Sequence, residues 1–517
     1  MFLNHLSTVL SSCIRSSLNY ITPTSNHYPL PPLHLLFFLS TSMENPRQYI
    51  VLFPFMSQGH FIPFLALAQL LEQKGFSIVF VSTPLNVKNL QKSLSPTSVK
   101  FAEISYNAAD HGFPPNAENT DSLPNDLIIP FINATPSLKL PFRTLLSDLI
   151  SSGQKPLCVV SDFLFGWAAD AAHEFGIFHL IFSVTGGFGM ACYCSMWLNS
   201  PHRNSQSVEF LLPDFPEAGN IHITQVTPAM LVAMEKDPLT NFQRKNVLSW
   251  ANSDGLLLNT VEELDKLGVL YFQRKLGIPV WAIGPLLLSE KDRSRTGRLS
   301  TISTEDCIQW LDQKEPNSVI YISFGSQNTI PASQMMKLAK ALESSGRNFI
   351  WVVRPPFGFD INAEFQAEEW LPEGFLQRIH EQDRGLIISK WAPQVEILAH
   401  KSVAAFISHC GWNSVLETMK YGVPVIAWSI AADQHYNAKF LVEKAGICVE
   451  VARGISFEVM SEDIVDKIEF MMGEGEGMRR KACEIKETIK DAMRDEESYR
   501  GSSVKNVEEF IAAAYTK

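Results

Sequence analysis

The sequence predicts an α/β fold made of two doubly wound, Rossmann-like domains that face each other across a cleft. The chain has 517 residues, more than one hydrophobic core usually serves, so we expect two domains. Short apolar runs alternate with helical patterns, which is typical of parallel sheets covered by helices. This alternation occurs in two series, separated by a polar segment at 289–298. Ligands of such sheets bind at the carboxyl ends of the strands, so the cleft is the expected site.

The first series opens with a buried strand at Tyr49–Phe53, which a loop at 54–63 is expected to follow. A helix is then predicted from Pro63 to Lys74, because Pro is tolerated in a first helical turn and Gly75 is a stop signal. The further predicted elements are strands at Ser77–Ser82, Leu157–Ser161, His179–Phe182 and Gly255–Leu258, and a helix from Asp162 to about Glu174.

The second series has its predicted strands at Val319–Phe324, Phe349–Val353, Leu386–Ser389, Val403–Ser408 and Val425–Trp428. The polar chain between the two series is predicted to be a linker. The expected division of the chain is an N-terminal extension at 1–46, a first domain at 47–285, a linker at 286–303, a second domain at 304–495, and a C-terminal helix at 496–517 that packs back on the first domain.

Residues 1–43 differ in composition from the rest of the chain. They contain no Asp or Glu, and Arg15 is their single Lys or Arg. One interpretation is that the natural start is Met43, immediately before the first strand. The other is an organelle-targeting peptide, a class in which a single Arg is unusual. The apolar run Leu33–Leu39 is shorter than the roughly 20 residues that span a bilayer, so no stable membrane anchor is predicted.

The bulk composition excludes some classes of function. The formal net charge is −11, which argues against a nucleic-acid partner, because such a partner needs a concentrated basic face. A bound phosphate must then be held by local devices such as helix N-termini. The eight cysteines are scattered and form no Cys-x-x-Cys pair. Reduced thiols and a cytoplasmic location are therefore expected.

The segment Trp391–Gln434 contains the most informative pattern. The strand Val403–Ser408 runs into His409-Cys410-Gly411-Trp412-Asn413-Ser414, and a helix through Met419 is expected to follow. A strand, a turn containing Gly and a helix start together form an anion site, because unpaired N–H groups and the helix dipole both favour a phosphate. Taken alone, Trp391 and His409 are more often structural residues, and Ser408 or Asn413 could be a plain helix cap.

This block of 44 residues resembles, at full length, the signature of plant secondary-product UDP-glycosyltransferases. The resemblance extends over the chain from about residue 47 and includes Gly59, His60 and Asp162. It implies a GT-B fold, in which the first domain binds an acceptor and the second binds a UDP-sugar. It further implies an enzyme that needs no cofactor, uses UDP-glucose as co-substrate and works as a monomer.

The resemblance also implies roles for individual residues of the donor site. His409, Asn413 and Ser414 would contact the phosphates from a turn that includes Gly411 and Trp412, and Ser326, after Gly325, would be a further phosphate contact. Glu417 would accept hydrogen bonds from the ribose. Trp391 would stack on the uracil, with Gln394 and the backbone of Ala392 on its edge, and Asp433 and Gln434 would bind the sugar. In this family a terminal Gln goes with UDP-glucose more often than His does. Ser429 and Ala431 stand where Pro and an aromatic residue are expected, which predicts a wider cleft near the sugar.

His60 and Asp162 are the predicted catalytic pair. Transfer to a hydroxyl needs a base that takes the acceptor proton, and His60 follows the first strand, where it would face the cleft. Asp162, at the end of another strand, would fix the tautomer of that histidine and stabilise its imidazolium form. The family uses a His–Asp pair at these positions. Asp162 could also be the N-cap of the helix that follows, and the two roles are compatible.

No Asp-x-Asp triplet occurs in the chain, so we expect no metal, and a single displacement that inverts the anomeric centre. The acceptor pocket is predicted to come from 107–125, 186–197 and 230–234, whose Phe, Met and Trp content suits a flat hydrophobic molecule, either a phenolic such as a flavonoid or a terpenoid. Two alternatives are an inactive UDP-sugar-binding regulator and a nucleotide-dependent oxidoreductase. The second lacks its Gly-x-Gly-x-x-Gly after the first strand.

Overall fold

The computed structural model describes residues 47–517, except 94–98, 233, 235–236, 289–301 and 455–456. Residues 47–517 form one compact unit. The predicted N-terminal extension and most of the predicted linker lie outside the described residues. The exact boundaries of the domains stay predictions, and below the first and second domains are named after the two large sheets.

The first sheet has seven parallel strands in the order β3-β2-β1-β4-β5-β8-β9. Its strands are β1 Tyr49–Phe53, β2 Ser77–Ser82, β3 Lys100–Glu103, β4 Pro156–Asp162, β5 Phe178–Ser183, β8 Gly255–Leu258 and β9 Val280–Ala282. The strand order reverses between β1 and β4. Such a reversal opens a crevice at the carboxyl ends of the two strands, and this is where ligands bind in open α/β sheets.

The second sheet repeats this arrangement with six parallel strands in the order β12-β11-β10-β13-β14-β15. Its strands are β10 Val319–Ser323, β11 Asn348–Val353, β12 Gly385–Ser389, β13 Val403–Ser408, β14 Val425–Ser429 and β15 Cys448–Arg453. Here the order reverses between β10 and β13. The prediction of two doubly wound α/β sheets is therefore confirmed.

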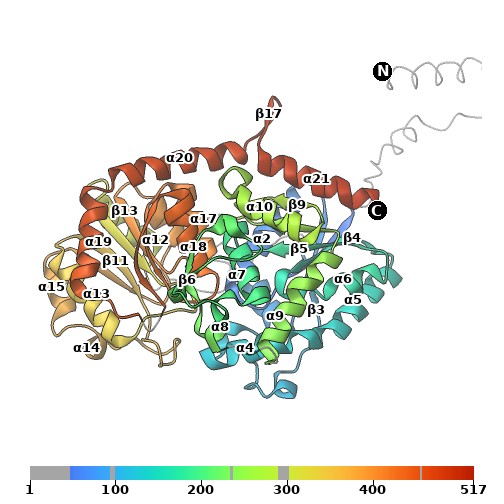
Figure 1. Ribbon diagram of the computed structural model, residues 1–517, viewed down its shortest axis with the longest axis horizontal. Helices are drawn as coiled ribbons and strands as arrows, with labels where there is room; N and C mark the ends of the chain where they lie inside the picture. Colours follow the sequence, from blue (N-terminus) through green and yellow to red (C-terminus); the bar gives the residue numbers. More distant parts are fainter. Residues whose placement is uncertain (1–46, 94–98, 233, 235–236, 289–301, 455–456) are drawn as a thin grey trace, which may run out of the picture. The chain divides into compact units, whose positions relative to one another are not determined.

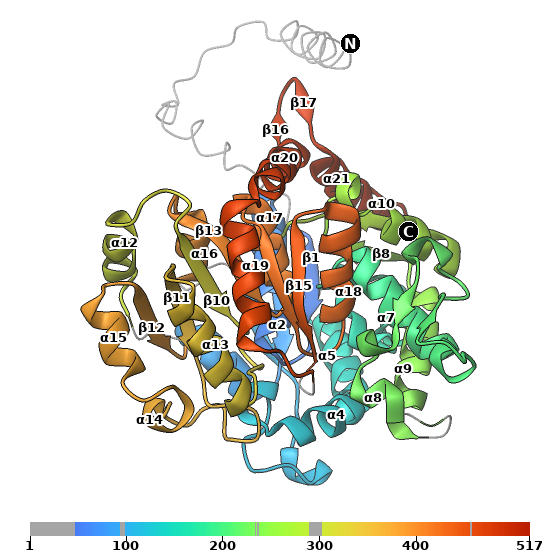
Figure 2. The ribbon, with the colours of Figure 1, turned by 60° about the vertical axis from the view of Figure 1, so that its left-hand side comes forward.

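Helices cover both faces of the second sheet. Along β10, Val319 and Tyr321 pack with helix α12, whereas Ile320 and Ile322 pack with α13 and α19 on the other face. This alternation of period two, with both faces apolar, is what a parallel sheet requires. Figure 2 shows α13 and α19 side by side on one face. The helices of this domain are α12 Thr304–Asp312, α13 Ala332–Ser344, α14 Ala367–Trp370, α15 Phe375–Glu381, α16 Gln394–Ala399, α17 Trp412–Tyr421, α18 Gln434–Lys439, α19 Ser461–Gly473 and α20 Glu476–Ala492.

The helices of the first domain differ from the prediction at the start. They are α2 Gln58–Gln73, α3 Pro84–Ser93, α4 Asn125–Ala134, α5 Lys139–Ser151, α6 Ala168–His173, α7 Gly187–Asn199, α8 Pro228–Val232, α9 Pro238–Ser249 and α10 Glu262–Leu276. Helix α2 begins five residues before Pro63, which lies inside it. The prediction that Pro63 starts the helix was wrong, and the loop predicted at 54–63 is confined to 54–57. His60 stands in the first turn of α2.

An interior Pro leaves one helical carbonyl without its usual donor, because Pro has no backbone N–H. In α2 the carbonyl that Pro63 leaves open is that of Gly59, four residues earlier. This oxygen instead accepts a hydrogen bond at 3.0 Å from the side-chain amide of Asn413, in the second domain. The helix therefore continues through Pro63 because the other domain satisfies the open carbonyl.

The last helix, α21 Ser502–Thr516, packs against the first domain. Figure 1 shows α20 and α21 following each other along the upper edge of the molecule, from the second domain to the first. Val507, Phe510 and Ala514 are buried in the core of the first domain. Ser503 donates through Oγ to the carbonyl of Gly284 at 2.6 Å. The end of the chain thus completes the domain in which the described chain begins.

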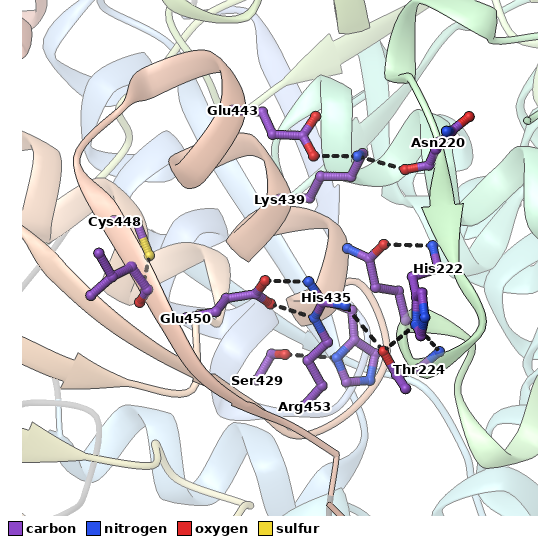
Figure 3. A network of polar contacts seen from close by, with 12 residues as sticks. Asn220, His222, Thr224, Ser429, His435, Lys439, Glu443, Cys448, Glu450 and Arg453 are labelled. Carbon is purple, nitrogen blue, oxygen red and sulfur yellow. Dashed lines mark hydrogen bonds and ion pairs between the residues drawn. The ribbon is translucent and has the colours of Figure 1, made fainter. Parts of the chain in front are cut away.

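Hydrogen bonds made by polar side chains join the two domains. Lys439 donates through Nζ to the carbonyl of Asn220 at 2.7 Å, and Arg453 donates to Thr224 Oγ1 at 3.1 Å (Figure 3). The Arg453 guanidinium is itself held by both carboxylate oxygens of Glu450. Among the residues that the structure describes, no helix combines the length and apolar character needed to cross a membrane.

Candidate active site

A cavity of about 510 Å³ lies between the two domains. Its walls come from the carboxyl ends of β1 and β4 in the first domain and of β10, β13 and β14 in the second. Nearly all of the predicted site residues line it, namely His60, Ser326, Trp391, Ala392, Gln394, His409, Gly411, Trp412, Asn413, Ser414, Glu417, Asp433 and Gln434. Asp162 is not on the wall but lies behind His60. The fold thus brings together residues that are up to 374 positions apart in the chain, as the numbering from 60 to 434 shows.

His60 and Asp162 are in direct contact. Nδ1 of His60 lies 2.7 Å from Oδ2 of Asp162. Asp162 is fully buried, and His60 keeps 16% of its side chain exposed. The same oxygen of Asp162 accepts from the backbone N–H of Phe55 at 3.2 Å, and its other oxygen accepts from that of Leu164 at 3.0 Å. Asp162 therefore caps the turn that follows β4 and contacts His60 at the same time.

The contact with Asp162 determines which nitrogen of His60 faces the cavity. A carboxylate only accepts hydrogen bonds, so the contact assigns the proton of a neutral imidazole to Nδ1 and its lone pair to Nε2. Phe163 stacks on the imidazole, with ring centroids 5.4 Å apart and planes at 28°, and Phe55 meets it edge-on at 5.1 Å. The two aromatic rings hold the orientation of the imidazole.

The imidazole of His409 lies between two glycines. A Cβ added to Gly325 would stand 2.5 Å from Nε2 of His409, and one added to Gly411 would stand 2.4 Å from it. Gly325 also has a φ of +82°, a conformation that favours glycine. Burial lowers the pKa of His409 to about 4, so this side chain is a neutral hydrogen-bonding group near pH 7.

The N-terminus of α17 points at the cavity and carries no acidic residue in its first turn. Gly411 is the N-cap residue, and Asn413 and Ser414 follow in the first turn. The unpaired N–H groups and the positive end of the helix dipole are therefore available to an anion. The indole of Trp412 turns away and donates to the carbonyl of Asn259 at 2.6 Å. Only the backbone of Trp412 is thus placed to contact a ligand.

Gln394, Ser414 and Glu417 form a polar cluster beside Trp391. Nε2 of Gln394 donates to Glu417 Oε2 at 2.8 Å and to Ser414 Oγ at 3.0 Å, and its Oε1 accepts from the hydroxyl of Tyr321 at 3.0 Å. Glu417 is almost fully buried. The cluster places Gln394 next to the residue expected to bind a ribose.

Strained backbone occurs beside the predicted ligand contacts. Lys390, Cys410 and Ala432 are non-glycine residues with positive φ, at 69°, 62° and 54°. Each immediately precedes a predicted site residue or, in the case of Cys410, stands between two of them. Strain of this kind persists where the surrounding structure holds a functional geometry.

Asp433 and Gln434 have hydrogen-bond partners in the structure. Oδ2 of Asp433 accepts from Thr185 Oγ1 at 2.5 Å, across the cleft, and from Asn437 Nδ2 at 2.9 Å. Oε1 of Gln434 accepts from the backbone N–H groups of Ile430 and Ala431, each at 3.0 Å. The Gln434 oxygen is therefore used by its own loop, and its Nε2 group is the part available to a sugar.

Two sequence-based expectations about the cavity wall were wrong. Ser429 is fully buried and bonds to His435 Nδ1 at 2.7 Å (Figure 3), and Ala431 packs against the core of the second domain. Neither lines the cavity, so their small size does not widen it. No described residue of 230–234 lines it either. Met230 instead packs against the hydroxyl of Tyr436.

Sequence reasoning missed several residues of the cavity. Ile128 and Ile132 from α4 and Gln243 from α9 line it, as does Thr185 after β5. The α4 and α9 residues occur in ordinary amphipathic patterns, which do not reveal what the helix faces. Thr185 follows the carboxyl end of a predicted strand. Because ligands bind at such ends, its position in the sequence could have indicated that it lines the cavity.

Two facing doubly wound sheets with the cavity between them define the GT-B architecture of glycosyltransferases. Two family models match the chain: "UDP-glucoronosyl and UDP-glucosyl transferase" at residues 304–475 and "Glycosyltransferase, N-terminal domain" at 48–287. UDP-glycosyltransferase 92A1 of Arabidopsis thaliana is 44% identical, over 90% of this chain and 97% of that protein. Scopoletin glucosyltransferase of Nicotiana tabacum is 35% identical, over 86% and 94%.

A solved structure agrees with these relatives. The chain resembles the Glycyrrhiza uralensis enzyme UGT73P12, complexed with glycyrrhetinic acid 3-O-monoglucuronide, with a TM-score of 0.77 and 29% identity over 91% of this chain and 96% of that one. The chain therefore belongs to the plant UDP-glycosyltransferase family and is a hexosyltransferase. The family expected from residues Trp391–Gln434 is confirmed.

Proposed function

We propose that this enzyme transfers glucose from UDP-glucose to a hydroxyl of a small hydrophobic plant metabolite, a phenolic of the flavonoid type or a terpenoid, with inversion and without a metal. The observation that supports this best is the contact of 2.7 Å between Asp162 and His60, where His60 lines the same cavity as the N-terminus of α17. This arrangement puts a base in the first domain and an anion site in the second.

In the proposed reaction, Nε2 of His60 removes the proton of the acceptor hydroxyl. The oxygen attacks the anomeric carbon, and the bond from that carbon to the phosphate oxygen breaks. UDP leaves with the electron pair, while Asp162 stabilises the imidazolium that forms. One displacement inverts the anomeric centre, so an α-linked donor gives a β-linked product.

The diphosphate charge is proposed to be met by hydrogen-bond donors. The N-terminus of α17 supplies backbone N–H groups, and Asn413, Ser414 and Ser326 supply side chains. His409 is neutral near pH 7 because burial lowers its pKa to about 4, so it contributes an N–H group rather than a full charge. Contacts of this type are worth about 0.3–1 kcal/mol each, so several are needed together.

The rest of the donor is proposed to lie between Trp391 and Gln434. Trp391 would stack on the uracil, with the backbone of Ala392 on its edge. The hydrogen bond from Gln394 to Glu417 supports a shared role for these two residues at the ribose, rather than Gln394 at the uracil. The sugar would meet Asp433 and the Nε2 group of Gln434.

We also propose a cytoplasmic monomer that needs no cofactor. The described cysteines are all free thiols, and six of the seven are buried. Free thiols suit a reducing compartment. Fluorescence microscopy of the tagged chain in plant cells tests the location, and sedimentation equilibrium at several concentrations tests the oligomeric state.

The decisive experiment combines the purified enzyme with UDP-glucose, excess EDTA and a panel of phenolic and terpenoid alcohols. We expect UDP release that depends on an acceptor, and a product whose NMR coupling at the anomeric proton is that of a β-glucoside. An α-glucoside would refute inversion, and activity that returns only with Mg²⁺ or Mn²⁺ would refute metal independence. UDP-glucose binding without transfer to any acceptor would instead identify an inactive regulator.

A further inference from the structure

Gln243 is a buried polar side chain on the cavity wall. It lies on α9, is 3% exposed and lines the cavity. Within the described part of the chain no residue forms a hydrogen bond with its amide, although its amide atoms are not sealed from the cavity. An amide that opens on a cavity binds water when the cavity is empty. A ligand that displaces this water must offer a hydrogen-bonding group of its own or leave the amide unpaired, which is costly.

The packing of α9 places Gln243 near the base. Asn246 and Trp250, three and seven residues further on, share its face of the helix. Both donate to the backbone carbonyl of Phe163, from Nδ2 at 2.7 Å and from Nε1 at 2.9 Å. The ring of Phe163 stacks on the imidazole of His60. Gln243 is therefore one helical turn away from the contacts that hold the ring beside the base.

The first-domain wall of the cavity combines apolar and neutral polar residues. Ile128 and Ile132 on α4 and Met190 on α7 line it from helices that pack against α9, and Leu164 lines it as well. Among the described lining residues of this domain there is no Lys, Arg, Asp or Glu. The basic side chains Arg354 and Lys390 line the cavity from the second domain. An acceptor against the first-domain wall thus meets apolar surface and neutral polar groups, among them the amide of Gln243.

We propose that Gln243 recognises a second polar group of the acceptor, a hydroxyl or a carbonyl, while the attacking hydroxyl lies at His60. This inference rests on the proposed function, because it assumes that the acceptor occupies the cavity between these two residues. It narrows the acceptor to an uncharged, elongated molecule with a polar group at each end. An acceptor that lacks the second group leaves the amide unpaired, which lowers the kcat/KM for that acceptor by about ten- to a hundred-fold.

The test compares 7-hydroxyflavone with 7,4′-dihydroxyflavone, and with the analogue that carries a carboxylate in place of the 4′-hydroxyl. Their binding is measured by quenching of tryptophan fluorescence in the presence of UDP, and their kcat/KM with UDP-glucose. The variants are Gln243→Met and Gln243→Asn. Methionine keeps the length of the side chain and removes the amide, and asparagine keeps the amide on a side chain that is one methylene shorter. Ile128→Met is the matched control, because it reshapes the same wall without changing its hydrogen bonds.

We expect the kcat/KM of the wild type to be about ten-fold or more higher for 7,4′-dihydroxyflavone than for 7-hydroxyflavone. We also expect the carboxylate analogue to bind more weakly than 7,4′-dihydroxyflavone. Gln243→Met should remove most of that preference and leave the KM for UDP-glucose unchanged, and Ile128→Met should affect both flavones alike. Three outcomes would overturn the inference. They are an equal effect of Gln243→Met on the two flavones, no preference between them in the wild type, and no binding of either flavone. Binding with the expected preference but without any transfer would instead refute the proposed function and leave the role of Gln243 standing.

Discussion

Asn413 donates from its side-chain amide to the carbonyl oxygen of Gly59, at 3.0 Å, and so joins the helix start that carries His60 to the helix start of the anion site. The carbonyl is open to this contact because Pro63 has no N–H to offer it. An amide has two N–H groups, so Asn413 can keep this bond and still contact a phosphate. The carbonyl that Pro63 leaves open therefore links the two helix starts across the cleft.

Pro63→Ala should stabilise the fold and weaken donor binding. Alanine restores the helical N–H to Gly59, and an interior Pro costs a helix about 3 kcal/mol relative to Ala. The restored bond competes with Asn413, whose contact is worth about 0.5–1.5 kcal/mol. We expect a higher melting temperature and a rise in the KM for UDP-glucose of about two- to ten-fold.

The control for this prediction is the same substitution in an Asn413→Ala background. There the contact is already absent, so Pro63→Ala should leave the KM unchanged. A rise of equal size in both backgrounds would show that Pro63 acts through another route.

Replacement of either His60 or Asp162 should stop glycosyl transfer and leave the binding of the donor intact. His60→Ala removes the proposed base, and Asp162→Asn keeps a side-chain oxygen for the cap on Leu164 but no longer fixes the tautomer. Each should lower kcat by about 10²–10⁴-fold. UDP binding, measured by calorimetry, should stay within about two-fold. If either variant keeps more than a tenth of the wild-type kcat, the assignment of the base is wrong.

Gln434 and Trp391 should affect donor choice differently. With its oxygen held by the loop, Gln434 offers a sugar only N–H groups, so it can favour one hydroxyl orientation. We expect a preference for UDP-glucose over UDP-galactose of about ten- to a hundred-fold, most of which Gln434→Ala removes. Trp391→Ala should weaken both donors alike, because stacking on uracil does not depend on the sugar.

The measurement is kcat/KM for both donors in the wild type and the two variants. Gln434 also holds the backbone at Ile430 and Ala431. The melting temperature of the Gln434→Ala variant must therefore be followed in parallel. An equal loss with both donors would mean that Gln434 only supports the loop, and the glucose proposal would lose its main argument.

The stability of the fold should fall as the pH drops below about 6.5. Burial lowers the pKa of His179 to about 3 and those of His409 and His435 to about 4. Between these values and the unfolded value near 6.5, the unfolded chain binds protons that the folded chain does not. Each group therefore costs up to about 1.4 kcal/mol per pH unit in that window.

Urea midpoints at pH 7.5, 6.5 and 5.5 test this prediction, with pH as the only variable. His435→Gln should reduce the loss of stability between pH 6.5 and 5.5. The exposed His380 serves as the control, because His380→Gln should leave the pH dependence as it is. A midpoint that stays constant down to pH 5.5 would contradict the prediction.

The sequence predicted the parts of the fold that are both buried and local. Strands such as β1 and β13 are continuous apolar runs, and their bounds agree with the prediction. The strands β3, β9 and β15 were missed. Strand β9 is only three residues long, and the edge strands β3 and β15 carry charged residues such as Glu103, Glu450 and Arg453. Edge strands often do so, which hides their pattern.

The candidate site shows the same division. The residues from Trp391 to Gln434 lie close together in the sequence, so their spacing carries the information. The contact between Thr185 and Asp433 and the position of Gln243 depend on how the two domains and α9 pack. Hydrophobic periodicity contains no information on such packing.

The burial of α21 in the first domain has a consequence for how the protein is made. Val507, Phe510 and Ala514 follow the second domain in the chain, so they are synthesised after it and reach their partners in the first domain late. The second domain can therefore close its own core before α21 is available. Domains usually fold in the order of synthesis. In this protein the domain that is translated first needs a helix that is translated after the second domain, and until that helix packs, part of its apolar core is uncovered.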